Sequence, residues 1–386
     1  MLACMKKVDL SKTAAAKVAQ RVPWLYRNEL PKTLWCEPGE IAALVHQGTY
    51  LATAFINPDS QLAARIITYD ADETVDDAFI ARRIKRAAAR REPFKSQTNA
   101  CRVVHAEADG LPGLVVDRYG DFIVFSITSA GMERFKDSVV ATLERLFSPK
   151  GILERADAIR EKEGLAVEER VHKGVLPERF IIKEDDKRFE TDLLHAQKTG
   201  FFLDQRRNRR IVGAYGKKRT LDLFANAGGF GIYAEAEYTK FVEISAPACK
   251  QIARNCTLNG LNNHDIVQDD VFKFLENEKA RYDLIIVDPP AFAKSRKAKA
   301  GAMRGWRYLI DRSLELLEDE GHLALFSCSH AVGLDDLMDA TRRIAATKGI
   351  DLEVIETMYQ DRDHPYKLHI PNSLYLTGVL LQRVGE

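Results

Sequence analysis

A cysteine and an aspartate follow two apolar runs in the C-terminal half of the chain. The run 282–287 leads into the sequence DPPAF at 288–292, and the run 322–327 leads into Cys328. The two prolines fix an extended backbone that cannot continue a sheet, so we expect Asp288 to project from the end of its strand. A thiol and a carboxyl group at neighbouring strand ends are suited to covalent catalysis assisted by an acid.

Carbon 5 of a pyrimidine is a substrate atom that needs such a pair. It is too weakly nucleophilic to take a methyl group from a sulfonium unaided, whereas addition of a thiolate to carbon 6 turns it into a reactive enamine. Cys328 is the candidate nucleophile and Asp288 the candidate acid near N3. The base that removes the carbon 5 proton is not identified. Cys249 and Cys256 lie seven positions apart in a predicted helix and are interpreted as packing residues.

A glycine-rich turn between a strand and a helix predicts a ligand site. The sequence LDLFANAGGFGIYA spans 221–234, where open α/β sheets bind ligands. Gly229, Gly231 and Ala234 formally match the dinucleotide motif G-x-G-x-x-A. However, Asp222 in the turn region would repel a pyrophosphate. Glu243, at the end of the next strand, comes 14 positions after Gly229, where the dinucleotide motif places its acid about 20 positions on.

S-adenosylmethionine fits this pattern better, because it carries an ammonium, a sulfonium and a ribose diol but no phosphate. We expect Glu243 to accept the ribose hydroxyls and Asp270 to reach the adenine amine. Asp222 and the amides near Gly228 would hold the methionine end. The residues predicted from this pattern to bind the cofactor are Asp222, Phe224, Asn226, Gly228, Glu243, Asp270 and Asp288.

Three regions differ in pattern, and we predict three domains, at 1–72, 73–185 and 186–386. The first has short apolar runs broken by turn residues, which is typical of a small β-barrel. The second has a predicted hairpin of 113–116 against 122–127, a helix over 132–147 and a polar segment at 156–177. In the third, strands alternate with helices, which predicts a mostly parallel, Rossmann-like sheet covered on both faces. Its seven predicted strands are Arg219–Phe224, Lys240–Ile244, Asp265–Gln268, Tyr282–Val287, His322–Ser327, Leu352–Met358 and Leu374–Leu381.

Composition excludes several classes of protein. The 386 residues include 57 basic and 56 acidic side chains and are 46% hydrophobic, which excludes a disordered or fibrous chain. No apolar stretch approaches the length of a membrane span and no signal peptide follows the start, so we expect a cytoplasmic protein without membrane contact. The six cysteines include no CxxC pair, so neither a metal site nor a disulfide framework is predicted.

Basic clusters predict contact with a nucleic acid. Because the formal net charge is only +1, a polyanion must be held by local patches. The segments 205–219 and 291–310 flank the predicted site and contain no acid, and Trp306 and Tyr308 could stack on bases. Their basic residues are Arg206, Arg207, Arg209, Arg210, Lys217, Lys218, Arg219, Lys294, Arg296, Lys297, Lys299, Arg304 and Arg307. A helix with a basic end at 82–91 is interpreted equally well as a capped surface helix or as a further RNA contact.

Taken together, these motifs resemble the RlmI-type large-subunit ribosomal RNA cytosine-5 methyltransferases. Further similar segments are VPW at 22–24, NPDSQ at 57–61, DGLPGLVVD at 109–117 and TGFFLDQR at 199–206. The resemblance implies an N-terminal PUA domain, a central α+β EEHEE domain and a C-terminal class I methyltransferase domain. It matches Cys328 to the family's nucleophile and places Gln205 in a stretch that lies against the cofactor. It also implies that the PUA domain contacts RNA and that homodimers form.

The leading hypothesis is therefore S-adenosylmethionine-dependent methylation of carbon 5 of a cytosine in 23S ribosomal RNA, with the base flipped into the cleft for attack by Cys328. Two alternatives stay open. The DPP sequence is related to motifs of enzymes that methylate base nitrogens, although Ala291 separates the prolines from the aromatic residue. An RNA-binding ribosome assembly factor without turnover is the other. The sequence does not reveal the nucleotide that is modified.

Overall fold

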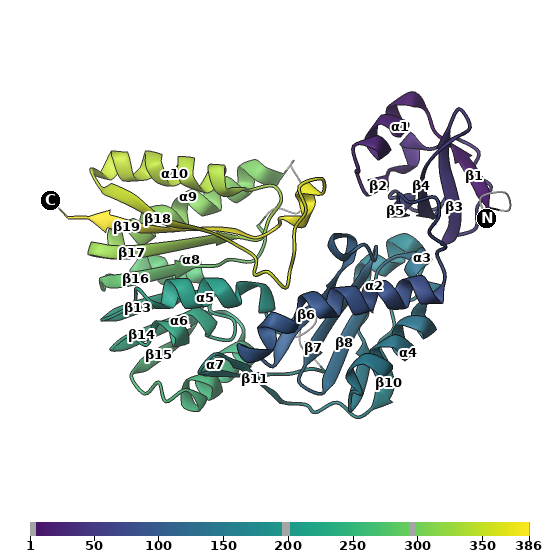
Figure 1. Ribbon diagram of the computed structural model, residues 1–386. Coiled ribbons are helices and arrows are strands. Elements are labelled where there is room, and N and C mark those ends of the chain that lie inside the picture. The colour runs from purple at the N-terminus through teal and green to yellow at the C-terminus, as the bar shows by residue number, and fades with distance from the viewer. Residues whose placement is uncertain (1–4, 195–200, 293–297, 386) are drawn as a thin grey trace. The chain divides into compact units, whose positions relative to one another are not determined.

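The computed structural model describes residues 5–194, 201–292 and 298–385, and its described residues form two compact units (Figure 1). The first unit falls within 1–185, 192–200 and 363–373, and the second within 186–191, 201–362 and 374–386. A segment near the C-terminus therefore belongs to the unit that begins the chain. The three domain boundaries predicted above stay predictions.

The first unit begins with a five-stranded sheet in the order β1-β3-β4-β5-β2. Its elements are β1 (Lys6–Asp9), α1 (Lys12–Ala19), β2 (Trp24–Leu25), β3 (Glu40–His46), β4 (Thr49–Ile56) and β5 (Ala64–Thr68). The tight turn between β3 and β4 uses Gln47 and Gly48, which both have positive φ angles, of 50° and 79°. Such turns match the twist of a hairpin. Val8, Leu25, Leu44 and Ile56 lie in the core of this sheet.

A second five-stranded sheet completes the first unit, in the order β10-β9-β8-β7-β6. Its elements are α2 (Asp77–Arg90), β6 (Ala100–His105), β7 (Leu114–Tyr119), β8 (Phe122–Ile127), α3 (Ala130–Glu133), α4 (Lys136–Phe147), β9 (Gly151–Glu154) and β10 (Arg170–Gly174), followed along the chain by β11 (Phe180–Glu184). The predicted hairpin is confirmed, because β7 pairs antiparallel with β8.

One prediction for this part of the chain is wrong, and one strand was not predicted. The helix expected over 132–147 is interrupted at Phe135, whose ring packs on Phe55 at 6.0 Å, so a tertiary contact breaks the helical pattern. The polar segment 156–177 contains strand β10, which among the described strands pairs with β9 alone. An exposed edge strand needs no alternation of apolar residues, so its sequence carries no strand pattern.

Seven strands in the order β15-β14-β13-β16-β17-β19-β18 form the sheet of the second unit. Its strands are β13 (Arg219–Leu223), β14 (Tyr238–Glu243), β15 (His264–Gln268), β16 (Tyr282–Val287), β17 (Leu317–Ser327), β18 (Asp351–Tyr359) and β19 (Thr377–Val384), and β12 (Lys187–Thr191) lies outside the sheet. All neighbours from β15 to β17 are parallel, whereas β19 runs antiparallel to β17 and β18. The predicted seven-stranded, mostly parallel sheet is confirmed.

Helices cover both faces of this sheet (Figure 1). They are α5 (Arg206–Gly213), α6 (Gly229–Ala234), α7 (Ala246–Leu258), α8 (Val271–Asn277), α9 (Lys299–Leu316) and α10 (Leu334–Lys348). Alternate strand residues point to opposite faces. Ile285 and Val287 pack with α8, α9 and α10, whereas Leu284 and Ile286 pack with α5 and α6. The strands are apolar on both sides, which makes their sequences continuous apolar runs.

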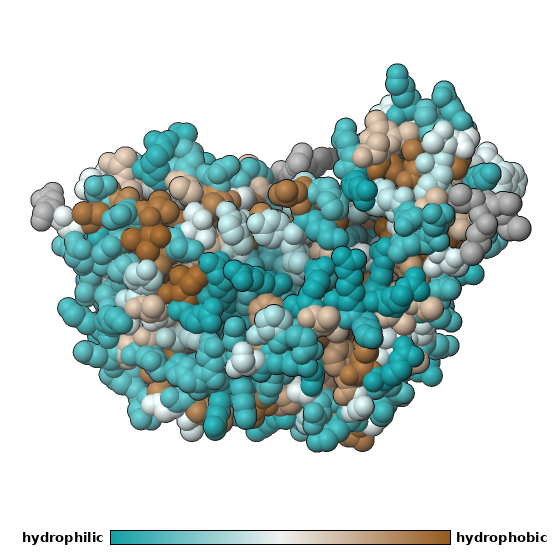
Figure 2. All heavy atoms as spheres, viewed as in Figure 1, coloured by the Kyte–Doolittle hydropathy of each residue, from teal (hydrophilic) through white to brown (hydrophobic). Residues whose placement is uncertain are grey.

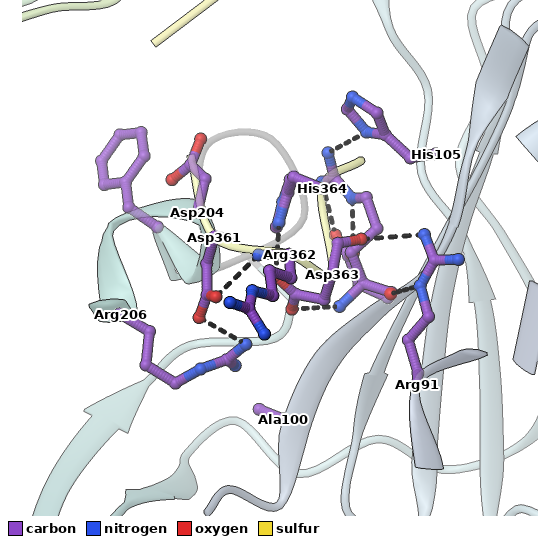
Figure 3. Close-up of polar contacts among 12 residues, drawn as sticks. Arg91, Ala100, His105, Asp204, Arg206, Asp361, Arg362, Asp363 and His364 are labelled. Atoms are coloured by element: carbon purple, nitrogen blue, oxygen red, sulfur yellow. Dashed lines mark hydrogen bonds and ion pairs between the residues drawn. The ribbon is translucent and has the colours of Figure 1, made fainter. Parts of the chain in front are cut away.

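Residues 363–373 are anchored in the first unit by buried polar contacts (Figure 3). The fully buried Asp363 accepts a hydrogen bond from the Arg102 amide at 3.1 Å, and Arg91 donates to its carbonyl at 2.8 Å. His364 Nδ1 donates to the Asp363 carboxylate at 2.8 Å. In the second unit, Arg206 forms an ion pair of 2.8 Å with Asp361. Arg362 thus stands between two separately anchored aspartates.

Among the helices that the structure describes, none has both the length and the apolar character that crossing a membrane requires.

Candidate active site

The ends of five parallel strands meet at one edge of the second unit's sheet. Leu223 lies beside Val242 and Val287, and Val287 lies beside Leu325. The chain leaves the sheet at the same level from each strand, so the predicted site residues come together at this edge. In the order of the strands from β15 to β17 they are Asp270, Glu243, the turn 224–228, Asp288 and Cys328.

The turn after β13 has an unusual backbone. Phe224, Asn226 and Gly228 have positive φ angles of 61°, 50° and 75°, which are uncommon for side chains other than glycine. The Asn226 amide donates to Glu243 Oε2 at 2.9 Å and so ties this turn to the end of β14. The predicted cofactor residues Phe224, Asn226 and Gly228 therefore belong to one constrained turn.

Packing explains the glycine at position 231. A Cβ atom there would lie 2.4 Å from the ring of Phe241 in β14, closer than real Cβ contacts. Gly231 lets α6 approach β14, so the formal match to a dinucleotide motif reflects helix–strand packing. This agrees with the sequence argument against a pyrophosphate.

Asp222 lies inside β13, and the expectation that it belongs to the turn is wrong. Its side chain is buried, with 1% exposure, and its Oδ2 accepts a hydrogen bond from the Gly231 amide at 2.9 Å. Burial raises the pKa of Asp222 to about 8; the Gly231 hydrogen bond opposes this rise, and the charges of Asp288 and Glu243 add to it. The Asp222 side chain thus binds the backbone of α6 at Gly231. The negative charges of Asp288 and Glu243 contribute to its raised pKa.

Glu243 and Asp270 form the acidic side of the edge. Glu243 accepts backbone hydrogen bonds from Asn226 and Ser245, and Asp270 Oδ1 caps α8 by accepting from Phe272 and Lys273. Oδ2 of Asp270 accepts no hydrogen bond from the residues that the structure describes. Within the described ranges, neither acid nor Asp222 forms an ion pair with a lysine or arginine. The carboxylates of Glu243 and Asp270 fit a cationic ligand such as S-adenosylmethionine.

Ile244 was not predicted as a site residue. It follows Glu243 directly and is 64% exposed, which is unusual for a large apolar side chain at the end of a buried strand. It offers exposed apolar surface directly after Glu243 in the chain. An isoleucine immediately after the acid at a strand end was the available signal in the sequence.

A chain of amides holds Asp288. Gln205 Nε2 donates to Asp288 Oδ2 at 3.0 Å, and Asn208 Nδ2 donates to Gln205 Oε1 at 2.6 Å. Gln205 and Asn208 are buried, with 4% and 0% exposure. The structure brings Gln205 to the edge, as the resemblance implied. Asn208, one turn later in α5, was missed, because an asparagine in a basic run gives no sign of its partner.

Cys328 lies at the end of β17, half-buried rather than enclosed in the core. Its Sγ is 4.0 Å from the carbonyl oxygen of Pro289, so the thiol faces the backbone of the DPP sequence. Buried serines on both sides fix the turn: Ser327 Oγ donates to the Val332 carbonyl at 2.8 Å, and Ser329 Oγ accepts from the Ala331 amide at 3.2 Å. The polar contacts of these serines orient the cysteine between them.

The other cysteines of the second unit are Cys249 and Cys256. Cys256 is fully buried, and burial raises its pKa to about 12. Cys249 is half-buried and donates to the Glu243 carbonyl at 3.4 Å. Burial raises the pKa of Cys249 too, and the charge of Glu243 adds to the rise. Both thiols are thus held in their neutral form, which is unfavourable for a nucleophile.

Trp306 is not available for stacking on a base, contrary to our expectation. It is 2% exposed, packs on Phe292 at 6.0 Å and belongs to the core of the sheet. Its position follows from the helical period of α9, in which Ala302, Trp306 and Leu309 share the buried face. Tyr308 is partly buried, and its hydroxyl donates to the Phe272 carbonyl at 3.2 Å.

Several residues of the first basic segment, 205–219, do not contact the site as predicted. Arg206 and Arg209 are buried; Arg206 pairs with Asp361, and Arg209 donates to the Phe202 carbonyl at 3.0 Å. Lys217 and Lys218 precede β13 and lie at the amino ends of the parallel strands, opposite the site. The prediction that they flank the site is wrong, because a basic run in the sequence does not show which sheet edge it reaches. The predicted residues Thr199, Gly200, Lys294, Arg296 and Lys297 lie outside the described residues.

The N-terminal halves of α9 and α10 enclose a basic groove of about 640 Å³. Its charged lining consists of Lys299, Arg304, Arg307, Asp336, Asp339 and Arg343. Lys299 pairs with Asp336 at 2.8 Å, and Arg343 pairs with Asp339 at 2.8 Å. Arg304 and Arg307 are exposed and form no ion pair with any described residue. Both helices begin at the carboxyl edge of the sheet, so this groove starts beside the site.

The strand order, the constrained turn and the acidic strand ends define a Rossmann-like, S-adenosylmethionine-dependent methyltransferase. Residues 167–365 match the family described as S-adenosylmethionine-dependent methyltransferase, and residues 8–69 match a PUA-like domain. A solved methyltransferase structure in complex with S-adenosylhomocysteine has a TM-score of 0.84 and 21% identity, with 98% of this chain and 100% of that chain covered. The predicted fold and cofactor are confirmed.

The chain belongs to the ribosomal RNA large subunit methyltransferase I family. It is 36% identical to the Tolumonas auensis protein named Ribosomal RNA large subunit methyltransferase I, over 98% of this chain and 99% of that protein. A protein of the same name from Aeromonas salmonicida is 34% identical over 97% of this chain and 98% of its own length.

Proposed function

We propose that this protein methylates carbon 5 of a cytosine in 23S ribosomal RNA through a covalent bond to Cys328. The observation that carries the proposal is the half-buried thiol of Cys328, whose Sγ is 4.0 Å from the Pro289 carbonyl beside Asp288. A base nitrogen has a lone pair and needs no thiol at this place. Ribosomal RNA is taken as the substrate because the relatives at 34–36% identity carry it in their names.

The acidic edge would hold S-adenosylmethionine, which supplies a methyl group bound to a positively charged sulfur. Glu243 would accept hydrogen bonds from the ribose hydroxyls, and Asp270, whose Oδ1 caps α8, would use Oδ2 to accept from the adenine amine. The exposed Ile244 would offer apolar surface to the adenine ring. The turn 224–228 would present backbone groups to the methionine end, with the buried carboxyl group of Asp222 below it.

Cys328 and Asp288 act on the pyrimidine. The Cys328 thiolate adds to carbon 6, and the Asp288 carboxyl group near N3 stabilises the adduct, in which carbon 5 is nucleophilic enough to take the methyl group. Gln205 holds the Asp288 carboxyl group through its 3.0 Å contact. A base then removes the carbon 5 proton, and the electron pair of that bond expels the Cys328 thiolate from carbon 6. We assign no residue to that base.

The groove between α9 and α10 would hold RNA phosphates beside the site. Arg304 and Arg307 are the groove arginines outside ion pairs among the described residues, so they can bind phosphate without breaking a contact. The cytosine must leave its stack to reach a thiol at a strand end. The backbone contacts would secure the strand while the base is extruded.

Substitution of Cys328 tests the proposal, with Cys249→Ala as the matched control on the same sheet edge. We expect Cys328→Ala to abolish 5-methylcytidine, by at least about a thousandfold in rate, while affinity for S-adenosylhomocysteine stays within twofold. RNA that contains 5-fluorocytosine should trap wild-type protein as a stable adduct, because the fluorine cannot leave as a proton does. Cys249→Ala should be trapped as wild type is.

Mass spectrometry of digested 23S RNA separates the alternatives. Full activity of Cys328→Ala, or methylation of a base nitrogen, would refute the covalent mechanism. Tight RNA binding with no methyl transfer to naked or partly assembled 23S RNA would favour a non-catalytic assembly factor.

A further inference from the structure

A second basic cavity, of about 620 Å³, lies entirely within the first unit. Its walls come from β5, from α2 and from residues 367–370. We call it the basic pocket, and its cationic lining consists of Arg21, Arg83, Arg86, Arg90 and Lys367. Figure 2 shows hydrophilic side chains gathered over α2 on the face turned to the viewer.

Some of these cations already have partners. Arg83 pairs with Glu73 at 3.1 Å, and Arg90 pairs with Asp109 at 3.0 Å. Arg21, Arg86 and Lys367 form no ion pair with any residue in the described ranges. The Arg21 guanidinium instead lies 4.8 Å from the centre of the Tyr69 ring.

The acids of the wall do not neutralise this excess. Asp109 also pairs with Arg91, and Glu107 pairs with Arg65 at 3.2 Å. Asp70 is the one wall carboxylate outside an ion pair among the described residues. Three cations outside ion pairs therefore face one such acid, in a protein whose formal net charge is only +1.

Residues 363–373 hold Lys367 at the wall of the basic pocket. Asp363 and His364 are buried at its start, and the Lys367 amide donates to Ser373 Oγ at 2.9 Å at its end. Burial lowers the pKa of the Lys367 ammonium, and the positive charge of Arg90 lowers it further. Holding an ammonium among arginines is unfavourable unless an anion compensates.

The chemistry of the pocket favours RNA phosphate as that anion. Guanidinium groups bind phosphate oxygens through paired hydrogen bonds, and a cavity of this volume accommodates a nucleotide unit. Tyr366 and Leu368 alternate with the pocket residues Lys367 and His369 and are 48% and 93% exposed. Exposed rings and apolar side chains beside a basic pocket are typical of surfaces that bind single-stranded RNA.

We propose that the basic pocket is a second RNA-binding site, which takes phosphate groups of the substrate strand outside the nucleotide that is methylated. The inference rests on the proposed function in one respect, namely that the substrate is RNA. It does not depend on which atom of the base receives the methyl group. The pocket would increase the affinity for RNA and fix the position of the RNA strand along the protein, without taking part in methyl transfer.

The test compares two triple variants that lose the same charge. Arg21→Gln, Arg86→Gln and Lys367→Gln together empty the pocket of its cations outside ion pairs. Lys12→Gln, Lys32→Gln and Lys85→Gln remove three exposed lysines of the same unit that do not line the pocket. The probe is unmodified 23S RNA made by transcription in vitro, and RNA binding is measured from low to moderate salt.

We expect the pocket variant to bind 23S RNA at least about tenfold more weakly. The slope of log binding constant against log salt concentration should be less steep by about two to three, which corresponds to about two to three lost phosphate contacts. Its affinity for S-adenosylhomocysteine and its rate at saturating RNA should stay within twofold of wild type. The lysine control should bind RNA nearly as wild type does. The single variant Arg86→Glu guards against misfolding, because this exposed side chain on α2 can be reversed in charge without disturbing the core.

Equal RNA binding by the pocket variant and the lysine control would overturn the inference, even if wild type makes 5-methylcytidine. A wild-type protein that methylates a base nitrogen, with RNA affinity lost in the pocket variant, would refute the carbon 5 proposal and support the pocket. Wild-type protein that binds no 23S RNA would overturn both.

Discussion

Burial of single polar side chains is the feature at the residue scale that sequence reasoning did not foresee. Asp222 and Arg206 were both predicted to face a ligand or RNA, and both are buried with 2% exposure or less. Asp222 illustrates the reason. The predicted strand Arg219–Phe224 already included Asp222, but the sequence does not show which face of the sheet its side chain occupies, and one residue of shift moves a side chain to the other face of a strand.

Asp222 also makes stability depend on pH. Its pKa is raised from 3.8 to about 8, so between these values the folded state keeps a proton that the unfolded state releases. The resulting stabilisation is complete below about pH 4 and is lost as the pH rises towards 8. Asp222→Asn does not titrate, yet its amide oxygen can still accept from Gly231. We expect thermal unfolding midpoints from pH 5.5 to 8.5 to fall more steeply for wild type than for this variant, and parallel profiles would contradict this.

Helices and strands of the second unit were predictable at the element scale, because buried parallel strands read as apolar runs. Strand β16 has its predicted bounds, 282–287, and Ser245 caps α7 as its sequence indicated, accepting from the Ala248 amide at 3.4 Å. Strand β10 was missed because an exposed edge strand has no apolar pattern. The placement of Lys217 and Lys218 was wrong for another reason: a charge run gives no information on topology.

The close packing of α6 on β14 predicts a sharp effect of a small substitution. In Gly231→Ala the added methyl group would lie 2.4 Å from the Phe241 ring, which is fully buried and cannot move away. We expect a loss of about 1–3 kcal/mol in the free energy of unfolding, together with at least about tenfold weaker binding of S-adenosylhomocysteine, because the turn before α6 must shift.

Gly349→Ala is the matched control for that substitution. This glycine follows α10, has a φ of +65° and has open space where a Cβ would lie. The alanine should cost about 1–2 kcal/mol through backbone strain alone and leave cofactor affinity unchanged in calorimetry. Equal effects of the two variants on cofactor binding would show that general destabilisation, rather than the turn, is responsible.

At the scale of the whole molecule, the division of basic residues between two sheet edges makes a prediction for RNA binding. Arg304 and Arg307 line the groove at the carboxyl edge, whereas Lys217 and Lys218 lie at the amino edge. Replacing both arginines with glutamine should weaken binding of 23S RNA and reduce the salt slope by up to about two. Replacing both lysines with glutamine removes the same charge and should change neither quantity. Indistinguishable filter-binding curves for the two variants would refute the assignment of the groove.

The return of residues 363–373 to the first unit has a consequence for how the protein is made. Synthesis runs from the N-terminus, yet Arg91 and Arg102 meet their partner Asp363 only after about nine-tenths of the 386 residues have left the ribosome. The portion of the protein that is translated first is thus completed almost last. A stop codon after residue 362 would remove Asp363, so Arg91 and Arg102 of the first unit would lose this buried partner.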